Sequence, residues 1–159
     1  METAVVILSA SDAGELLTLQ RAAYVTEAQA HDDVWRPPLV QSPDEVTTEL
    51  SASNVLALGL RDTNGRLVGA VRVTVDPATT IAELGRLVVA PDVQGQGLGS
   101  RLLALAEQRL PPEVGEMRLF TGDRSVGNLR LYARVGFRET HRTPTSGGYA
   151  LVHLTKDVR

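Results

Sequence analysis

The sequence predicts a mixed α/β fold whose strands and helices follow the order β-α-α-β-β-β-α-β-α-β-β. Short apolar runs of strand length alternate with segments whose apolar residues recur at helical spacing. Thr63-Asn64-Gly65 lies between two apolar runs, and Asn-Gly in that setting is a strong β-hairpin signal. A glycine-rich stretch at 95–99 leads directly into a leucine-rich segment, which is typical of a loop that opens a helix.

The N-terminal third is expected to contain one strand and two helices. Residues 3–8 are apolar and form the strand, and residues 12–30 carry apolar positions at helical spacing. The segment 31–43 contains three prolines and is expected to be irregular. A shorter helix follows within 42–50, where Ser42 or Asp44 can cap its first turn.

The rest of the chain is expected to alternate between strands and helices. A long helix should run from the glycine loop to Pro111-Pro112, where proline cannot continue it, and a second helix should span 125–135. The strands are expected at 54–60, 66–76, 81–90, 116–122, 137–141 and 148–155.

Length and composition favour one globular domain over residues 1–159. The chain is 43% hydrophobic and 22% charged, with a net charge of −3 and no dense cluster of Lys and Arg. We therefore expect neither nucleic acid nor an anionic membrane as a partner. Cysteine is absent, which excludes a disulfide framework, a thiolate metal site and a cysteine nucleophile.

The sequence favours a cytoplasmic protein without a bound metal. The N-terminus has Glu2 where a signal peptide needs positive charge, and no apolar run approaches the roughly eighteen residues that span a bilayer. His31, His141 and His153 lack the spacing of metal ligands, so no metal site is assigned.

The glycine loop is tested first against two phosphate-binding motifs, and both fail. A P-loop needs a lysine after its last glycine, and none lies nearby. A dinucleotide fingerprint needs a third glycine where Ser100 or Leu102 stands. A flexible turn before a helix is the simple alternative for a loop of this kind.

A third motif, Gln/Arg-x-x-Gly-x-Gly/Ala, is met by Gln94, Gly97 and Gly99. Here the sequence resembles the GCN5-related N-acetyltransferase (GNAT) superfamily, over a region from about Ile81 to Phe137. The resemblance implies a central, mostly antiparallel sheet with a V-shaped splay between two parallel strands, and acetyl-CoA as the acetyl donor. It also implies that loop amides cradle the pyrophosphate of coenzyme A. The loop residues concerned are Gln94, Gly95, Gln96, Gly97, Leu98, Gly99 and Ser100.

The strand before the loop carries two further predictions from this resemblance. Leu87, Val88 and Val89 match the residues whose main chain binds the pantetheine arm, although an ordinary buried strand would have the same sequence. Gly85 within the strand suggests a bulge or a close approach. Glu83 lies fourteen residues before Gly97, which matches the general base of the histone acetyltransferase branch. A solvated strand carboxylate is the alternative for Glu83.

The segment 125–137 resembles the second motif of the family, with Leu131, Tyr132, Gly136 and Phe137 in register. Tyr132 is therefore the predicted general acid toward the departing thiolate, and packing against Phe137 is the alternative role. Two positions depart from the motif: Ser125 stands at the usual asparagine and Asn128 at the usual alanine. We keep both as predicted cofactor contacts.

The acceptor site is the part of the family pattern that transfers least. Acidic and aromatic residues of the first helix region could attract and enclose an amine, although solvated surface charge is the simpler interpretation. These residues are Tyr24, Glu27, Asp32, Asp33 and Trp35.

Together these features predict transfer of acetyl from acetyl-CoA to the primary amine of a small molecule or peptide, by direct attack in a ternary complex. The alternative is a module that binds acyl-CoA as a sensor without turnover. A homodimer is compatible with the resemblance.

Overall fold

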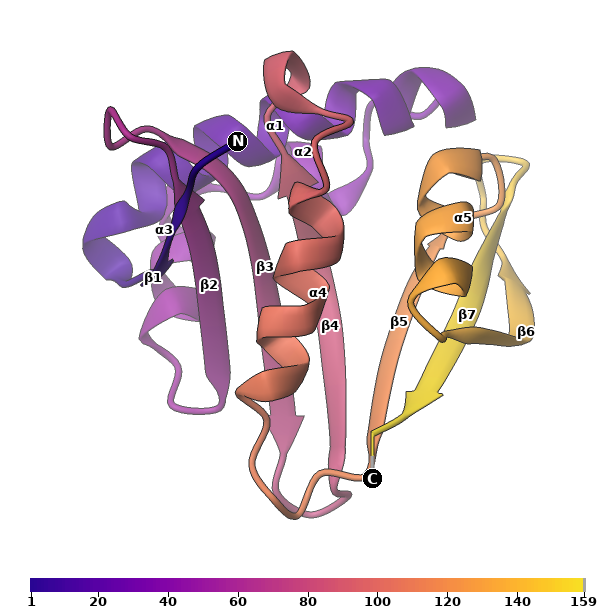
Figure 1. The fold of residues 1–159 in the computed structure, drawn as a ribbon. Coiled ribbons are helices and arrows are strands. Elements are labelled where there is room, and N and C mark those ends of the chain that lie inside the picture. The colour runs from indigo at the N-terminus through magenta and orange to yellow at the C-terminus, as the bar shows by residue number, and fades with distance from the viewer. Residues whose placement is uncertain (159) are drawn as a thin grey trace.

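The computed structural model describes residues 1–158 and confirms the mixed α/β fold. Its strands form one seven-stranded sheet in the order β1-β2-β3-β4-β5-β7-β6 (Figure 1). All neighbouring strands are antiparallel except β4 and β5, which are parallel. The strands are β1 (Ala4–Ile7), β2 (Val55–Arg61), β3 (Leu67–Asp76), β4 (Ile81–Val89), β5 (Glu116–Gly122), β6 (Arg138–Pro144) and β7 (Ala150–Asp157).

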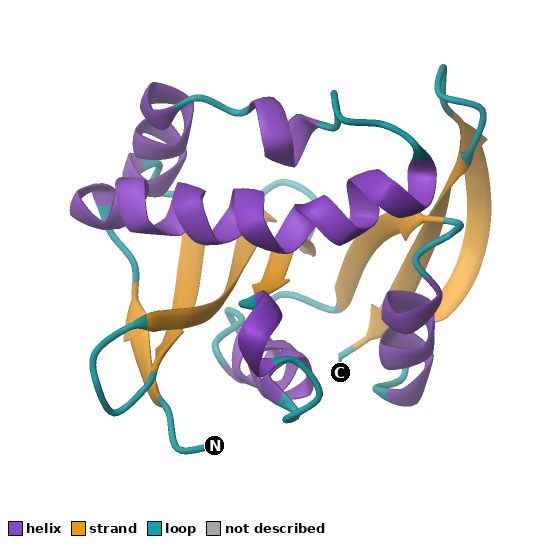
Figure 2. Ribbon diagram, turned by 90° about the horizontal axis from the view of Figure 1, so that it is seen from above, coloured by secondary structure: helices purple, strands orange, loops and turns teal. Residues whose placement is uncertain are grey.

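The helices cover both faces of the sheet (Figure 2). The helices are α1 (Ala13–His31), α2 (Pro37–Val40), α3 (Pro43–Ser51), α4 (Leu98–Gln108) and α5 (Val126–Arg134), with short 3-10 turns η1 (Ala10–Asp12) and η2 (Pro91–Val93). On one face of β3, Arg72 donates to Gln20 of α1 at 2.8 Å. On the other face, a Cβ atom at Gly69 would lie 3.1 Å from Leu102 of α4. The core therefore has two layers, one on each side of the sheet.

One helix was missing from the expected order. The segment 31–43 was expected to be irregular, yet it contains the single turn α2. Pro37 and Pro38 occupy the first positions of that turn, where a missing N–H breaks no hydrogen bond and the fixed φ of proline suits the helix. The two prolines therefore begin a short helix here.

The sheet opens between its two parallel strands. The pairing of β4 with β5 joins only Ile81–Glu83 to Glu116–Arg118, and the strands then separate (Figure 1). Past Glu83, no strand within residues 1–158 pairs with the edge of β4 that faces β5. The predicted V-shaped splay is present, and it leaves main-chain groups of β4 facing the gap.

A bulge lies in β4 just after Gly85, as the sequence predicts. The pairing with β3 shifts between Arg72↔Gly85 and Ala70↔Val88, so two residues of β4 oppose one of β3. Arg86 within the bulge has φ 53°, a left-handed conformation that costs a residue with a side chain about 1 kcal/mol or more. The bulge therefore redirects the side chain of Arg86.

Among residues 1–158, no helix combines the length and the apolar character that crossing a bilayer requires.

Candidate active site

The glycine loop joins η2 to α4 in a conformation that needs glycine. Gly95 and Gly97 both have φ 78°, in the left-handed region that only glycine adopts readily. A Cβ atom at either position would meet no other atom within 4 Å, so the loop faces open space. Gly97 is the N-cap of α4, whose first N–H groups have no partner within the helix. The loop thus offers exposed donors at the positive end of a helix dipole.

A cavity of about 640 Å³ lies between this loop, β4 and α5. It contains the predicted cofactor residues, with one exception. Leu87, Val88, Val89, Gln94, Gly95, Gly97, Leu98, Gly99, Ser100, Ser125 and Asn128 all line it. Gln96 does not belong to this lining. We call this space the cofactor cavity.

The cofactor cavity suits a long ligand that carries amides and phosphates. The edge of β4 along Leu87–Val89 is unpaired on the side of the gap, so an extended amide chain could bind there as an added strand. The loop with its open glycines lies at the end of that strand and suits a diphosphate. These residues fit the pantetheine arm and the pyrophosphate of coenzyme A.

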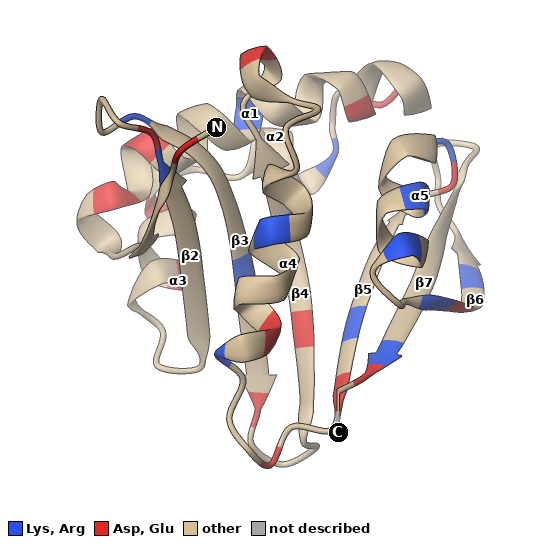
Figure 3. Ribbon diagram, viewed as in Figure 1, with Lys and Arg blue, Asp and Glu red and all other residues tan. Residues whose placement is uncertain are grey.

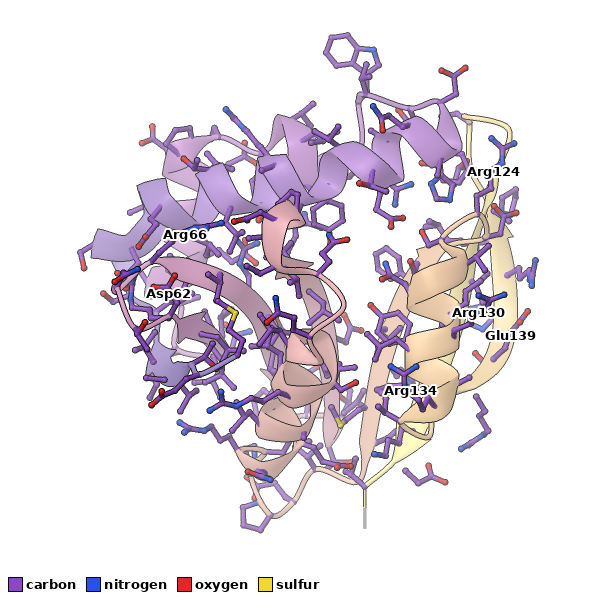
Figure 4. The ribbon with its side chains drawn as sticks, turned by 45° about the horizontal axis from the view of Figure 1, so that its top comes forward. Asp62, Arg66, Arg124, Arg130, Arg134 and Glu139 are labelled. Atoms are coloured by element: carbon purple, nitrogen blue, oxygen red, sulfur yellow. The ribbon has the colours of Figure 1, made fainter. Side chains whose placement is uncertain are left out.

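Two arginines of the cofactor cavity were not predicted from the sequence. Arg124 and Arg134 line it from opposite ends of α5, which also carries Arg130 (Figures 3 and 4). Arg124 donates its main-chain N–H to Nε2 of the buried His31 at 3.1 Å. The sequence did contain a signal for them. The spacing of arginines along the segment 124–134 places positive charges along one helix beside the predicted phosphate site.

A second cavity of about 590 Å³ lies beyond the cofactor cavity, among the end of α1, α2, β4, β5 and the loop before β7. Tyr24, Glu27, Leu87 and Asn128 line both cavities, so the two spaces meet at these residues. We call the second space the acceptor cavity. Of the predicted acceptor residues, Tyr24, Glu27, Asp33 and Trp35 line it, whereas Asp32 ends α1 in a left-handed conformation and does not.

Glu27 links α1 to the start of α5. Its carboxylate accepts hydrogen bonds from the Ser125 hydroxyl and, at 3.4 Å, from Nδ2 of Asn128. The two positions that depart from the second family motif therefore hold this carboxylate at the junction of the cavities. These hydrogen bonds fix the position of the Glu27 carboxylate at the junction, where its oxygens can interact with a cationic group.

Tyr132 lies on α5 and lines the acceptor cavity. It is 5% exposed, and burial is the main cause that raises the pKa of its hydroxyl, with Tyr24 and Glu27 adding to the effect. Within residues 1–158 that hydroxyl has no hydrogen-bond partner, while the ring packs edge-on against Phe137 at 5.9 Å. Tyr132 thus stays protonated and keeps its O–H free to donate.

Glu83 lies outside both cavities. Its side chain is exposed and lines another hollow together with Glu116, Arg118 and His153. That hollow adjoins the acceptor cavity at Leu84, Leu119 and Phe120. The structure brings Glu27, and not Glu83, to the junction of the acceptor and cofactor cavities. The role of Glu83 as general base stays a prediction.

Two arginines of the acceptor cavity, the buried Arg36 and the half-buried Arg86, were also missed from the sequence. Arg36 is 8% exposed, and its Nε and Nη1 atoms have no hydrogen-bond partner among residues 1–158. The same holds for the buried Nε atom of Arg86 in the β4 bulge. Nothing in a single sequence marks these arginines, because a proline-rich loop and a strand bulge bring them together.

The charges around Tyr24 show how close these groups lie. Burial raises the pKa of the Tyr24 hydroxyl, and Glu27 raises it further. Arg86, Arg36 and Arg72 act in the opposite direction and lower it. Tyr24 therefore lies in the field of three guanidinium groups and one carboxylate.

The comparison with protein families now identifies this architecture. The family model described as Acetyltransferase (GNAT) family matches residues 21–137, which is most of the chain. The chain belongs to the GNAT family of acetyltransferases. The match includes the glycine loop and the second motif, so the resemblance seen in the sequence is confirmed.

One curated relative matches part of this GNAT chain. It is 34% identical over 83 residues to an aminoalkylphosphonate N-acetyltransferase of Salmonella typhimurium, a match of 49% of this chain and 54% of that protein. The chain thus spans about half the length of that relative.

Solved structures agree on the fold. The ribosomal-protein-S18-alanine N-acetyltransferase of Escherichia coli superposes with a TM-score of 0.79 at 20% identity, covering 99% of this chain and 94% of that one. The PaiA N-acetyltransferase of Thermoplasma acidophilum, solved with coenzyme A, gives 0.72 at 22% identity over 99% of both chains. At such identities the likeness establishes the GNAT fold alone.

Proposed function

We propose that this protein transfers the acetyl group of acetyl-CoA to a primary amine by direct attack within a ternary complex. The observation that carries the proposal is the meeting of two cavities at Tyr24, Glu27, Leu87 and Asn128 in a chain of the GNAT family. Each cavity can hold one reactant, and their junction brings the two reacting groups together. The comparison structure solved with coenzyme A supports acetyl-CoA as the donor.

The glycine loop and the β4 edge bind the donor. The N–H groups after Gly97 meet the pyrophosphate, and the main chain of Leu87–Val89 pairs with the pantetheine amides, so the thioester lies near Leu87 at the junction. Arg124 and Arg134 add positive charge along the same cavity. The absence of cysteine excludes an acyl-enzyme on a thiolate and favours direct transfer.

Glu27 receives the proton of the acceptor. An alkyl ammonium has a pKa of about 10.4, so only about one molecule in 2,500 is neutral at pH 7. A carboxylate at the junction lowers this barrier by accepting the proton, directly or through water, as the nitrogen attacks the carbonyl carbon. Glu83 is the rival base, and its exposed place in another hollow makes it the weaker candidate.

Tyr132 assists the leaving group. The new C–N bond forms as the C–S bond breaks, and negative charge collects on the departing sulfur. A buried tyrosine that stays protonated stabilises that charge by donating a hydrogen bond from its O–H. The sulfur takes up the second proton that the attacking nitrogen loses, relayed by the Tyr132 hydroxyl or by water, and leaves as a thiol.

The test measures two quantities on the same protein: thermal stabilisation by acetyl-CoA, and release of free coenzyme A thiol with a panel of primary amines. We expect stabilisation by acetyl-CoA alone and thiol release only when an amine is present. Stabilisation without release for every amine would instead favour the sensor alternative. If acetyl-CoA neither stabilises the protein nor releases thiol with any amine, both functions are contradicted.

A further inference from the structure

We propose that the acceptor amine carries a negatively charged oxygen group, such as a carboxylate or a phosphonate, which Arg36 and Arg86 bind in the acceptor cavity. The inference rests on the proposed function and names the class of its acceptor substrate. It starts from an imbalance in how the charged groups of this cavity are paired.

The acidic groups of the acceptor cavity have partners within the protein. Glu27 accepts from Ser125 and Asn128. Asp33 accepts from the Tyr149 hydroxyl at 2.8 Å and from the main-chain N–H of Trp35 at 3.0 Å. These carboxylates are thus held by neutral donors, and neither forms an ion pair with an arginine within residues 1–158.

The two arginines of the same cavity lack such partners. Neither Arg36 nor Arg86 forms an ion pair or a conventional hydrogen bond with another described residue through its guanidinium. Arg36 lies with its guanidinium carbon 5.4 Å from the centre of the Tyr149 ring, a contact that fixes its position without satisfying its donors. A buried charge without a partner, such as that of Arg36, is costly, and proteins rarely keep one without a purpose.

Another buried arginine, Arg72, provides the internal reference. It is 3% exposed, and its guanidinium donates to Gln20 at 2.8 Å and pairs with Glu49 at 3.4 Å. Its Nε atom has no hydrogen-bond partner among residues 1–158, so Arg72 differs from Arg36 and Arg86 in its paired Nη atoms. It does not line the acceptor cavity. The chain therefore pairs its structural arginine with a carboxylate, while the two that face the cavity have none.

The backbone supports a functional reading of Arg86. The β4 bulge holds this residue at φ 53°, a strained conformation for an arginine, and directs it into the cavity lining. Guanidinium groups present several donors in a planar fork that matches carboxylate and phosphonate oxygens. A ligand oxyanion would satisfy the unpaired donors and neutralise the buried charge.

The acceptor cavity then offers groups for both charges of one substrate. Glu27 lies at the junction with the cofactor cavity and suits the ammonium group, whereas Arg36 and Arg86 line the acceptor cavity alone and suit an oxyanion. A zwitterionic amine complements this arrangement. A diamine would place its second positive charge beside the arginines.

The experiment compares acceptors of equal chain length: aminoalkylcarboxylates, aminoalkylphosphonates, uncharged alkylamines and diamines. We expect kcat/KM for at least one oxyanionic series to exceed that of the uncharged amine by about 10- to 100-fold, as hydrogen bonds to charged groups imply. The two oxyanionic series separate a carboxylate site from a phosphonate site. Equal or higher kcat/KM for uncharged amines or diamines would overturn the proposal.

Substitutions assign the preference to the arginines. Arg36→Gln and Arg86→Gln should each reduce the ratio of oxyanionic to uncharged acceptors, and Arg86→Lys should retain part of it because it keeps the charge and loses the fork. Arg142→Gln is the matched control, since Arg142 pairs with Glu139 on exposed β6. An unchanged ratio in both glutamine variants would overturn the assignment. If one variant fails to fold, the other still tests it.

A binding measurement separates this proposal from the proposed function. Propylphosphonate and butyrate contain the oxyanion but no amine, and propanamide is their uncharged counterpart. We expect one of the two anions, but not propanamide, to raise the Tm of the wild-type protein and to lose this effect in Arg36→Gln or Arg86→Gln.

Loss of acetyl transfer with all amines, with this stabilisation intact, would contradict the proposed function alone. Transfer without either anion effect or acceptor preference would contradict the oxyanion site alone.

Discussion

The cofactor cavity and the acceptor cavity meet at four residues but are built in different ways. The cofactor cavity uses main chain, with glycines and a strand edge from the continuous stretch 87–100, and residues of α1 and α5 complete its lining. The acceptor cavity uses side chains gathered from residues as far apart as Tyr24 and Leu151. Main-chain donors suit one ligand that does not vary, whereas side chains can change with the acceptor. The difference predicts distinct effects of substitutions on the two sides.

The largest expected effect comes from a substitution in the glycine loop of the cofactor cavity. Gly97→Val should reduce acetyl-CoA affinity by more than about 100-fold, because a branched side chain at φ 78° is strained and occupies the space in front of the loop amides. Titration calorimetry with acetyl-CoA measures the effect. Gly65→Val is the matched control, since Gly65 has φ 83° and similar open space but lies in the hairpin turn away from the cavity. Equal acetyl-CoA affinity in the two variants would contradict a pyrophosphate site at the glycine loop.

Tyr132→Phe tests the leaving-group side of the junction. It should lower kcat by about 100-fold, the lower end expected of general acid catalysis, and change acetyl-CoA affinity little. Steady-state kinetics together with calorimetry separates the two quantities. The ring contact with Phe137 survives this substitution, so an unchanged kcat would assign Tyr132 to packing alone.

Glu27 at the cavity junction and Glu83 in the hollow are the two candidates for the general base. Substituting each of them shows which one acts. Glu27→Gln should lower kcat/KM by about 10- to 100-fold at pH 7, and raising the pH should recover part of the loss as the amine deprotonates by itself. Glu83→Gln should change kcat/KM by less than about threefold. The measurement is a pH profile of both variants beside the wild type. A larger loss in Glu83→Gln would restore Glu83 as the base.

The smallest expected effect concerns the hollow that contains Glu83. Burial and the stacked ring of His141, 4.2 Å away, lower the pKa of His153. A lowered pKa in the folded state means that the unfolded chain binds the proton more readily. The contribution of neutral His153 to the free energy of unfolding is therefore complete above about pH 6.5. It is lost as the pH falls through the pKa of His153 in the folded protein.

An NMR titration of the ring protons of His153 measures this shift. We expect its midpoint below about 6.5 and no change on addition of acetyl-CoA, because the hollow shares no lining residue with the cofactor cavity. A midpoint that acetyl-CoA moves would connect the hollow to the cofactor cavity.

The comparison also explains which features could be predicted from the sequence. Gly95, Gly97 and the strand before them are close together in the sequence, so a short motif and its resemblance to the GNAT family indicated the loop and its neighbours. Arg36 and Arg86 come together only through tertiary structure, one from the proline-rich segment and one from a bulge. The prolines of α2 show the same limit, because proline marks a break in one context and the first turn of a helix in another.

Ser125 and Asn128 illustrate an intermediate case. Their departure from the family motif was visible in the sequence, and both were expected to contact the cofactor. Both line the cofactor cavity, and the structure adds that they also hold Glu27. The partner lies about a hundred residues away, so no local pattern indicates it.

The last turns of α1 reach across the gap where β4 and β5 part. Glu27 bonds to Ser125, and His31 fills the space beside Gly122, where an added Cβ would collide with its ring. Only three residue pairs join the two strands at the base of the sheet, so these contacts fix how far the two halves stand apart. Side-chain size at positions 31 and 122 therefore bears on the width of the gap between β4 and β5.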